Sequence, residues 1–586
     1  MIQPLADKIE QHLQNAFQSL GLEATLGRVV PSGQADYHYQ CNGAFKGAKI
    51  KGCAPLVLAN ELQQNLFSLQ TFADVSVSAP GFINIVVHDA CLAEYGNRIF
   101  EDQRLGVPLN ELPQKIVIDF GGINIAKAMH VGHLRSSIIG ESLQRIARFL
   151  GDEVISDIHL GDWGLPIGML IEEFKLLYPD WPYFQEGFDE ETFETSPVTI
   201  EQLEVLYPQA AERCKEAGAR EKARKTTADL QSGHRGYQAL WQRFRQVSIE
   251  DIKRQFEPLD VHFDLWLGES SVNDIMPALL KELKDHQIAQ ASDGATIVEV
   301  ATDDDKKPMP PLILMTSDGS VTYGMTDIAT IVQRREMFNP QYILYVVDNR
   351  QSLHFEQVFR AAKKIKSSED ISLEHIAFGT LNGPDGKPFK TRSGGVMKLQ
   401  GLLDSAILKA QERIEEADLG ADISPQGREE IAKAVAISAI KFSDLTIPRM
   451  SDYIFDLDKF VSFQGKTGPY LLYTAVRIKS LLAKAKEQGL TPGTITIETD
   501  KQRDIILNVV QLPRMLKASY EERAPHHLCE YAYTLAQKFS TFYQTCPILS
   551  NKDLKQAASW LALANLTLFF LERILSLLGI KIPEKM

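Results

Sequence analysis

Lys115-Ile-Val-Ile-Asp-Phe120 is a short apolar run bounded by Gly121-Gly122, and residues 133–150 follow with the spacing of an amphipathic helix. Gly151, directly after them, is typical of a helix end. Residues 154–158 then have the composition of a second strand. A strand, a helix and a strand in this order predict a βαβ unit in a parallel sheet, which decides an α/β fold class for this part of the chain.

The sequence after this unit changes character. Residues 172–255 are long, polar and helical in pattern, which indicates an insertion into the sheet domain. Two later apolar runs, Pro311-Leu-Ile-Leu-Met315 and Tyr342-Ile-Leu-Tyr-Val-Val347, predict further strands. From about residue 401 onward the strand signals nearly vanish and amphipathic helices dominate, so we expect the module at residues 459–586 to be all-helical.

The N-terminal residues, 1 to about 110, alternate helix and strand signals. Residues 5–20 have helical spacing, and Pro80-Gly-Phe-Ile-Asn-Ile-Val-Val87 reads as a turn followed by a strand. Pro108 and Pro113 mark a linker after this module. With 586 residues in total, the chain is long enough for about three to four domains.

The composition excludes several classes of protein. Hydrophobic residues make up 44% of the chain and charged residues 24%, as in soluble globular proteins. No apolar stretch reaches the roughly 18–20 residues of a membrane span, and Asp7, Lys8 and Glu10 make the first residues unlike a signal peptide. The six cysteines are scattered without a CxxC pair, so we expect a reduced, cytoplasmic protein without a disulfide framework or a protein-bound metal.

The net charge is −14, which taken whole is unlike a nucleic-acid-binding protein. The charge is unevenly spread along the chain, however. Residues 459–586 hold 17 Lys/Arg and 10 Asp/Glu, a net of +7, so residues 1–458 carry −21. A basic helical module attached to an acidic body therefore leaves nucleic acid as a partner of the C-terminal part.

The strongest local motif is His130-Val-Gly-His133, which stands between the first strand and the following helix. A helix N-terminus offers free amides and a positive dipole end to a phosphate. Two imidazoles there can donate hydrogen bonds as negative charge builds up in a transition state, and Gly132 leaves room for a flat ring against the backbone. Two solvent-facing histidines at a helix start would give the same pattern without this chemistry.

The second motif is Gly383-Pro-Asp-Gly-Lys-Pro-Phe-Lys-Thr-Arg-Ser-Gly-Gly395, a glycine-rich loop that carries Lys387, Lys390 and Arg392. Cations between glycines suit a loop that closes over a polyphosphate. An ordinary solvated basic loop is the alternative for this segment alone. The histidine motif upstream favours the phosphate interpretation.

The two motifs together resemble the HIGH and KMSKS signatures of the class I aminoacyl-tRNA synthetases. Asn124-Ile-Ala-Lys-Ala-Met-His-Val-Gly-His-Leu-Arg-Ser-Ser-Ile-Ile-Gly140 is similar, almost residue for residue, to the signature of arginyl-tRNA synthetases. The resemblance covers essentially the whole chain. Further matching segments, in chain order, are Gly161-Asp-Trp-Gly164, Leu230-Gln-Ser-Gly233, Gly268-Glu-Ser270, Gln351-Ser-Leu-His-Phe355, Phe389-Lys-Thr-Arg392 and Gly468-Pro-Tyr470.

The resemblance implies a multidomain protein with a doubly wound, Rossmann-like parallel-sheet core and an all-α anticodon-binding bundle. The implied reaction is ATP-dependent ligation of L-arginine to its cognate tRNA through an arginyl-adenylate, with AMP and diphosphate released. ATP with Mg²⁺, arginine and tRNA are the implied partners of a cytoplasmic monomer. The implied domains are a tRNA-contacting module (1–110), a catalytic domain with its insertion and loop (115–400), a helical stem (401–458) and the anticodon-binding domain (459–586).

The resemblance also assigns the residues of the ATP site. The histidines of the motif would stabilise charge at the α-phosphate, with Gly132 beside them. The family often lacks the second lysine of KMSKS, whose place Pro388 takes here, and a lysine before the HIGH motif is thought to compensate. The implied catalytic and ATP-binding residues are Lys127, His130, Gly132, His133, Lys390 and Arg392.

Arginine recognition requires a carboxylate, because the guanidinium fork pairs with carboxylate oxygens. Tyr323 and Asp327 are four residues apart, on one face of a helix expected after Gly319, and match the guanidinium-binding pair of the family. A helix N-terminal aspartate and a packed tyrosine would give the same spacing. The resemblance places Asp119, Asn124 and Gln351 at the amino and carboxylate groups of the substrate. Leu165-Pro166 depart from the family's usual Thr-Gln, so the pocket is expected to differ there.

In the C-terminal module, aromatic and basic residues recur with helical spacing suited to stacking on unpaired RNA bases. The candidate tRNA-binding residues are Tyr470, Tyr473, Arg477 and Lys479, although the two tyrosines would also fit a bundle core. Three other functions remain open from the sequence: a class I synthetase for another amino acid, a nucleotidyltransferase that makes a small-molecule adenylate, and a non-catalytic paralogue that only binds.

Overall fold

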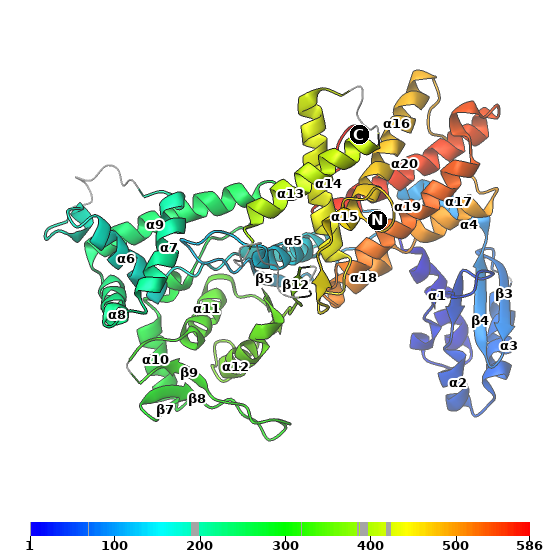
Figure 1. Ribbon diagram of the computed structural model, residues 1–586. Coiled ribbons are helices and arrows are strands. Elements are labelled where there is room, and N and C mark those ends of the chain that lie inside the picture. The colour runs from blue at the N-terminus through cyan, green and yellow to red at the C-terminus, as the bar shows by residue number, and fades with distance from the viewer. Residues whose placement is uncertain are drawn as a thin grey trace. The chain divides into compact units, whose positions relative to one another are not determined.

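The computed structural model describes residues 2–67, 69–188, 198–317, 319–383, 386, 397–417 and 423–586. It divides into two compact units. One unit contains residues 111–410 and 447–459, and the other contains residues 1–110, 411–446 and 460–586. The second unit is therefore made of three segments that are separate in the sequence. Figure 1 colours these segments blue, yellow and orange to red.

The first unit is built on a four-stranded parallel sheet in the order β11-β10-β5-β6. Its strands are β5 (Lys115–Phe120), β6 (Glu153–Asp157), β10 (Tyr342–Val346) and β11 (Ser372–His375). The chain runs outward from β5 to β6 and returns on the other side of β5 at β10, which makes the sheet doubly wound, as predicted. The strand order reverses between β5 and β10, so the carboxyl ends of these strands mark the expected ligand site.

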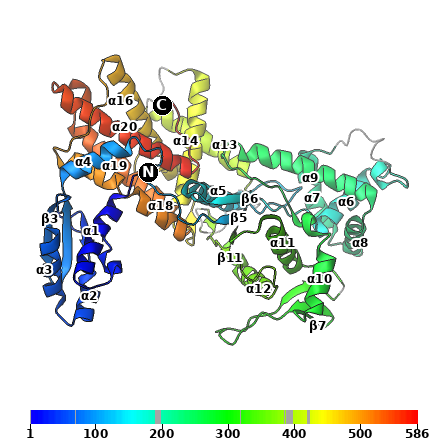
Figure 2. The same cartoon turned by 180° about the vertical axis from the view of Figure 1, so that it is seen from behind.

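Helix α5 (Gly132–Leu150) follows β5 and packs on the sheet, as Figure 2 shows from behind. It ends at Gly151, whose φ of 101° is a left-handed conformation that favours glycine. Gly140 allows close contact with the sheet, because a Cβ there would lie 2.2 Å from the Phe120 ring. The predicted order of strand, helix and glycine stop is confirmed.

The predicted insertion is also helical. It contains the end of α6 (Leu165–Leu177), α7 (Ile200–Arg213), α8 (Ala219–Gln231) and α9 (Arg235–Phe256). The later predicted strands are both present, but only β10 joins the parallel sheet. The run at 311–315 forms β9 (Leu312–Met315), which pairs antiparallel in a separate sheet, β7-β8-β9. The remaining elements of the first unit are α10 (Met276–Asp285), β7 (Ala289–Ser292), β8 (Ala295–Val298), α11 (Tyr323–Phe338), α12 (Ser352–Ala362), β12 (Leu381–Asn382), β13 (Tyr453–Ile454), α15 (Leu457–Phe460) and the first part of α13 (Leu399–Glu416).

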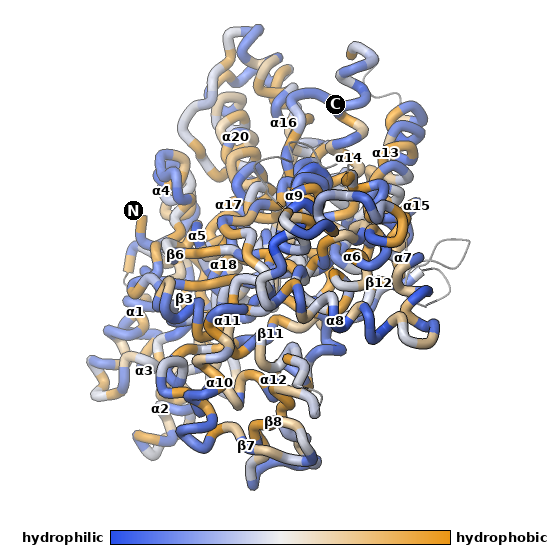
Figure 3. The backbone as a smooth tube through the Cα atoms, turned by 90° about the vertical axis from the view of Figure 1, so that its left-hand side faces the viewer, coloured by the Kyte–Doolittle hydropathy of each residue, from blue (hydrophilic) through white to orange (hydrophobic). Residues whose placement is uncertain are grey.

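The second unit combines an antiparallel sheet, in the order β1-β2-β4-β3, with a helical bundle. Its N-terminal elements are α1 (Leu5–Ser19), β1 (Val30–Pro31), β2 (Tyr39–Cys41), α2 (Ala44–Lys51), α3 (Pro55–Leu66), β3 (Phe72–Ser78), β4 (Phe82–Val87) and α4 (Asp89–Ile99). The bundle contains α14 (Pro425–Leu445), α16 (Gly468–Glu487), α17 (Asp500–Val509), α18 (Leu512–Glu521), α19 (His526–Thr545) and α20 (Leu554–Leu577). Figure 3 shows long hydrophobic stretches along α20, the core helix of the bundle.

The N-terminal module is tied to the bundle within this unit. The Arg503 guanidinium donates to both carboxylate oxygens of Asp89, at 2.6 and 2.7 Å. Asn97 and Ile495 exchange two hydrogen bonds, one in each direction. Segments that are about 400 residues apart in sequence therefore form one compact body.

Candidate active site

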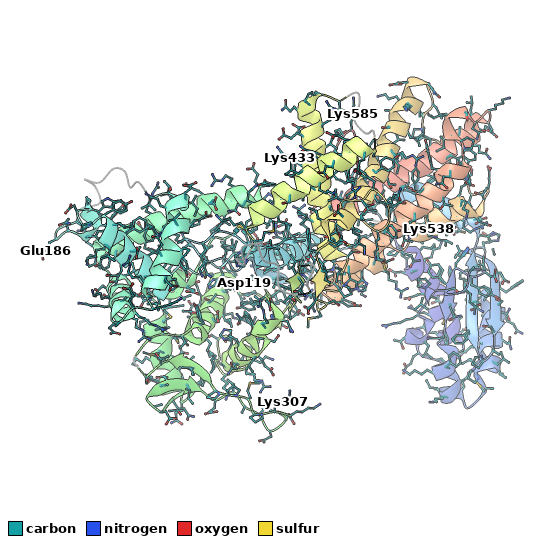
Figure 4. The ribbon with its side chains drawn as sticks, in the orientation of Figure 1. Asp119, Glu186, Lys307, Lys433, Lys538 and Lys585 are labelled. Carbon is teal, nitrogen blue, oxygen red and sulfur yellow. The ribbon has the colours of Figure 1, made fainter. Side chains whose placement is uncertain are left out.

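A buried charge cluster lies at the carboxyl edge of the parallel sheet. Asp119 is the last residue but one of β5 and stands in register with Asp157 at the end of β6. Arg334 of α11 donates to both carboxylates, at 2.7 and 2.8 Å, and its side chain is 1% exposed. Figure 4 labels Asp119. The predicted site residue Asp119 is thus already paired with a cation of the protein.

His159 completes the cluster. Its Nδ1 lies 3.6 Å from Asp157, and its backbone has a φ of 43°. Burial works against protonation of His159, but the adjacent carboxylates of Asp157 and Asp119 outweigh it and raise the pKa of the imidazole. Burial likewise opposes ionisation of Asp157, but His159 and Arg334 hold the pKa of Asp157 well below its usual range. The cluster therefore places two carboxyl groups around the buried Arg334 guanidinium, and burial raises the pKa of Asp119 in spite of that cation.

The two histidines of the HxGH motif stack on each other at the start of α5. Their ring centroids are 3.7 Å apart, with an interplanar angle of 19°. The backbone N–H of Gly132 donates to Nδ1 of His130 at 3.1 Å, and the backbone N–H of His130 donates to Nδ1 of His133 at 3.2 Å. Each Nδ1 accepts, so each neutral ring carries its proton on Nε2. The fold thereby fixes both rings as Nε2–H donors.

Both imidazoles are neutral near pH 7. Burial and the nearby Lys127 lower the pKa of His130. Burial, His130 and Lys127 lower the pKa of His133 to about 3. A neutral imidazole can donate its N–H to a phosphate oxygen without carrying a formal charge.

Gly132 makes this arrangement possible. A Cβ at Gly132 would lie 2.9 Å from two atoms of the His130 ring. The glycine thus leaves room for the imidazole of its own motif, which refines the expectation that a ring packs against it. The motif is also anchored from one side: the backbone N–H of Val131 donates to the carbonyl of Met397, and that of Leu399 to the carbonyl of Met129. The segment directly after the glycine-rich loop therefore lies beside the histidines.

A cavity of about 570 Å³ opens where α6, α8 and α11 meet. This volume is in the range of small-ligand sites. Leu165 and Pro166, which depart from the family's usual residues, lie in its wall. Its other lining residues are Trp163, Gly164, Arg224, Thr227, Ala228, Gln231, Glu269, Asn273, Met276, Gly319, Ser320, Val321, Thr322, Tyr323 and Thr326.

Glu269 is a cavity residue that the sequence reasoning missed. Burial, reinforced by the charges of Asp162 and Asp327, raises the pKa of Glu269 to about 7, while His159 acts in the opposite direction. The preceding Gly268 faces the Asp162 carboxylate, which accepts hydrogen bonds from both the backbone and the hydroxyl of Ser270. Asp162 thereby holds the loop that presents Glu269. Glu269 stands in the family-like segment Gly268-Glu-Ser270, which was the signal in the sequence. A guanidinium has donors for more than one carboxylate, so a second acidic residue beside Asp327 could have been expected.

Tyr323 and Asp327 share one face of α11, as predicted, and Tyr323 begins the helix. The Asp327 carboxylate lies 2.5 Å from Nε2 of His354 on α12. Electrostatic interactions link Asp327 to Glu269 and also to Tyr323. His354 was also missed, although it stands in the quoted segment Gln351-Ser-Leu-His-Phe355.

Asn124 and Gln351 lie at the ends of the two central strands. Asn124 is exposed and forms an isolated parallel bridge with Gly161. A Cβ at Gly161 would lie 1.9 Å from the Asn124 side-chain oxygen, so the glycine makes room for this amide. Gln351 is exposed in the short turn of 3₁₀ helix that follows β10. Both amides are therefore available at the switch point, where the strand order reverses between β5 and β10.

Lys127 connects the histidine motif to the cavity. Its ammonium lies 4.6 Å from the ring centroid of Tyr207 on α7, and Tyr207 interacts in turn with Tyr323. The structure thus brings together the predicted residues Lys127, His130 and His133 on one side and Tyr323 and Asp327 on the other. The predicted residues Lys390 and Arg392, with most of the glycine-rich loop, lie outside the described residues.

The four tRNA-binding candidates lie on α16 in the bundle. The Tyr470 hydroxyl is 3.1 Å from the Ser540 hydroxyl, and the Arg477 guanidinium lies 4.3 Å from the Tyr543 ring centroid. Lys479 forms ion pairs with Glu572 and Glu584, at 3.6 and 2.8 Å. The remaining candidate, Tyr473, is half-buried. These contacts make the face of α16 partly structural.

Three family models match the chain in order. Residues 3–87 match the arginyl-tRNA synthetase N-terminal domain, and residues 97–457 match the catalytic domain of class I tRNA synthetases of the arginine type. Residues 471–586 match the DALR anticodon-binding domain.

Curated relatives match along their full length. The arginine–tRNA ligase of Maricaulis maris is 48% identical and that of Alkaliphilus oremlandii 43% identical, each over 99% of this chain and 100% of the relative. Among solved structures, the arginyl-tRNA synthetases of Plasmodium falciparum (24% identity, TM-score 0.81) and Thermus thermophilus (20% identity, TM-score 0.77) share the fold. These two matches cover 100% and 99% of this chain, and 100% of each structure.

Proposed function

The chain belongs to the arginyl-tRNA synthetase family of class I, whose members charge tRNA with arginine through an aminoacyl-adenylate, and we propose which of its residues carry out that ATP-dependent reaction. The proposal is supported chiefly by the Lys127 ammonium, which lies 4.6 Å from the Tyr207 ring and interacts electrostatically with the stacked histidines, while Tyr207 interacts electrostatically with Tyr323 in the wall of the cavity. These interactions link a phosphate-binding corner, formed by Lys127, His130 and His133, to a cavity suited to a guanidinium.

In the first step, a carboxylate oxygen of arginine attacks the α-phosphorus of ATP, and pyrophosphate leaves with the electrons of the broken P–O bond. Negative charge spreads over the phosphate oxygens in the transition state. We assign the Nε2–H groups of His130 and His133 to donate to these oxygens, since their Nδ1 atoms accept from the backbone. Lys127 supplies the nearest positive charge. We assign Lys390 and Arg392 of the glycine-rich loop as further cations that contact the phosphates.

The cavity supplies the amino-acid specificity in this proposal. Asp327 and Glu269 pair with the guanidinium, and Tyr323 packs beside them. Asn124 and Gln351 hold the α-amino and carboxylate groups at the switch point of the sheet. Asp119, which shares Arg334 with Asp157, is assigned to the α-amino group as a hydrogen-bond acceptor.

In the second step, a hydroxyl of the terminal adenosine of tRNA attacks the arginyl carbonyl, and AMP leaves. We assign residues 1–110 to outer tRNA contacts, 115–400 to catalysis, 401–458 to a stem and 459–586 to the anticodon. Tyr470, Tyr473, Arg477 and Lys479 are the proposed contacts of the bundle. The match of residues 471–586 to an anticodon-binding model supports this assignment.

Three further properties belong to the proposal: Mg²⁺ enters with ATP, the enzyme acts as a monomer, and it works in the cytoplasm. Within the described residues, α20 is long and apolar enough to cross a membrane, but 72% of its apolar window is buried inside the protein. α20 is therefore a core helix of a soluble protein.

Amino-acid-dependent exchange of pyrophosphate into ATP, measured with each of the twenty amino acids and with and without tRNA, tests the proposal. We expect exchange with arginine alone, and we expect it to require tRNA. Exchange driven by another amino acid in place of arginine would refute the assigned pocket. A His130→Ala enzyme that still sustains growth in place of the wild type would refute the assigned chemistry.

A further inference from the structure

Helix α7 of the insertion is fixed firmly on one side. Leu203, Leu206 and Ala210 are buried on this face, and α7 packs against α6 and α9. At its C-terminal end, Arg213 donates to both carboxylate oxygens of Glu173 on α6, at 2.8 and 3.2 Å. The position of α7 is thus set by the core of its own domain.

The other face of α7 contacts two lysines at the phosphate-binding corner. Glu204 and Tyr207 are three residues apart, and so they are neighbours on the helix surface. The Tyr207 ring lies under the ammonium of Lys127, with 4.6 Å between nitrogen and centroid. The Glu204 carboxylate lies 2.7 Å from the Lys398 ammonium.

Both lysines belong to segments that carry the HxGH chemistry. Lys127 stands three residues before His130 and lowers the pKa of both imidazoles, so its charge reaches them in this position. Lys398 forms an antiparallel bridge with His130 itself. One turn of α7 therefore contacts the approach to the motif and the segment that follows the glycine-rich loop.

We propose that Tyr207 is a positioning residue that holds the Lys127 ammonium against the α-phosphate during adenylate formation. This inference rests on the role of Lys127 proposed above. A lysine side chain has four rotatable bonds and loses much rotamer freedom when it is fixed. The rigid ring reduces the number of positions that the ammonium occupies before ATP arrives.

An aromatic partner suits this task better than a carboxylate. A carboxylate would form a direct ion pair with Lys127 and compete with the phosphate oxygens for its N–H groups. The ring attracts the cation through its negative face and leaves the charge unneutralised. Lys127 consequently remains available to donate to phosphate while its stem is held.

Tyr207 also faces the side of the arginine cavity. It interacts with Tyr323, the first residue of α11, in the wall of the cavity. In the proposed reaction, the attacking carboxylate of arginine and the α-phosphate meet between the cavity and the histidine motif. Tyr207 is therefore placed to align the cation with the bond that forms.

The test is a double-mutant cycle on arginine-dependent pyrophosphate exchange with tRNA present. We expect Tyr207→Leu to lower kcat/KM for ATP by roughly 5- to 30-fold, the range of a cation–π contact. Tyr207→Phe keeps the ring and should recover most of that loss. In the Lys127→Ala background, Tyr207→Leu should have no further effect, because the group that it positions is gone.

Val205→Ala, at an exposed position on the same helix, is the matched control and should retain the wild-type rate. Equal losses in Tyr207→Phe and Tyr207→Leu would overturn the inference. Phenylalanine keeps the aromatic ring and leucine does not, so equal losses would mean that the ring has no part in the effect. A full loss from Tyr207→Leu in the Lys127→Ala background would also overturn it, while leaving the role of Lys127 intact. An unchanged rate in Lys127→Ala alone would refute both that role and the inference.

Discussion

At the scale of single residues, Asp327 determines how tightly the guanidinium is held. Asp327→Ala removes one carboxylate and leaves the His354 hydrogen bond without its partner. Loss of a charged hydrogen bond of this kind costs about 2–3 kcal/mol, so we expect the KM for arginine to rise roughly 30- to 150-fold. The KM for ATP should stay within about twofold, because the histidine motif is untouched.

Steady-state exchange kinetics over both substrates measure this prediction. Asp285→Ala, an aspartate on the exposed surface of α10, is the matched control. An unchanged arginine KM in Asp327→Ala would remove Asp327 from the pocket. Equal changes in both KM values would indicate a general structural defect instead.

Glu269 makes arginine binding sensitive to pH. Its raised pKa of about 7 means that the free enzyme carries a proton on this carboxyl below pH 7 and loses it above. A guanidinium favours the ionised form, so arginine binding releases a proton, and affinity rises as pH increases through 7 and then levels off.

Calorimetric titration of arginine at pH 7, in two buffers with different ionisation enthalpies, measures the proton release directly. We expect a fraction of a proton per arginine bound in the wild type and close to none in Glu269→Gln. Equal apparent enthalpies in the two buffers for the wild type would contradict the assignment of this carboxyl to the pocket.

The residue scale also shows what sequence could and could not provide. His130, His133 and Gly132 are local in sequence, and their spacing alone suggested a phosphate site. Glu269 and Tyr207 could not be assigned in the same way, because their roles depend on neighbours more than 50 residues away. Their side chains become informative only when the fold brings them together.

At the scale of elements, Arg334 joins α11 to two strands. Arg334→Met would leave Asp119 and Asp157 buried without their cation. Breaking a buried pair in this way typically costs about 3–5 kcal/mol. We therefore expect a clearly lower denaturation midpoint, together with loss of exchange activity.

Denaturant unfolding followed by circular dichroism measures this change, with Arg335→Met as the neighbouring control. Arg335 pairs with Asp370, whose side chain is 62% exposed, so its loss should cost less than about 1 kcal/mol. Similar midpoints for Arg334→Met and the wild type would show that the cluster does not stabilise the sheet.

Element prediction succeeded where the pattern was local. The strand, helix and glycine stop from residue 115 to 151 follow from apolar periodicity and one left-handed glycine. The partners of a strand do not follow from its own residues. β9 was recognised as a strand, yet its antiparallel pairing with β8 is a long-range choice that a run of four apolar residues does not encode.

At the scale of the whole molecule, the separation of charge predicts how tRNA binds. A +7 bundle on a −14 chain should bind tRNA through released counterions. We expect the logarithm of tRNA affinity to fall linearly with the logarithm of KCl concentration. Arg477→Ala should reduce this slope by roughly 0.7–0.9, the value of one phosphate contact.

Lys479→Ala should reduce the slope less, since Glu572 and Glu584 already neutralise that lysine. Filter binding over a series of salt concentrations measures both variants. A larger effect at Lys479 than at Arg477 would contradict this distribution of contacts. The sequence alone ranked the two residues equally, because ion pairs with distant glutamates are invisible in helical spacing.

The uncharged, backbone-locked imidazoles of the HxGH motif also bear on how the enzyme turns over. A site lined by fixed positive charges would retain pyrophosphate and AMP, and each cycle would have to break strong ion pairs before the next. Two neutral N–H donors hold a phosphate by direction more than by charge. The two rings therefore add directed donors without adding charge to the cations of Lys127, Lys390 and Arg392 that we assign to the same phosphate, so they do not raise the electrostatic barrier to product release beyond those cations.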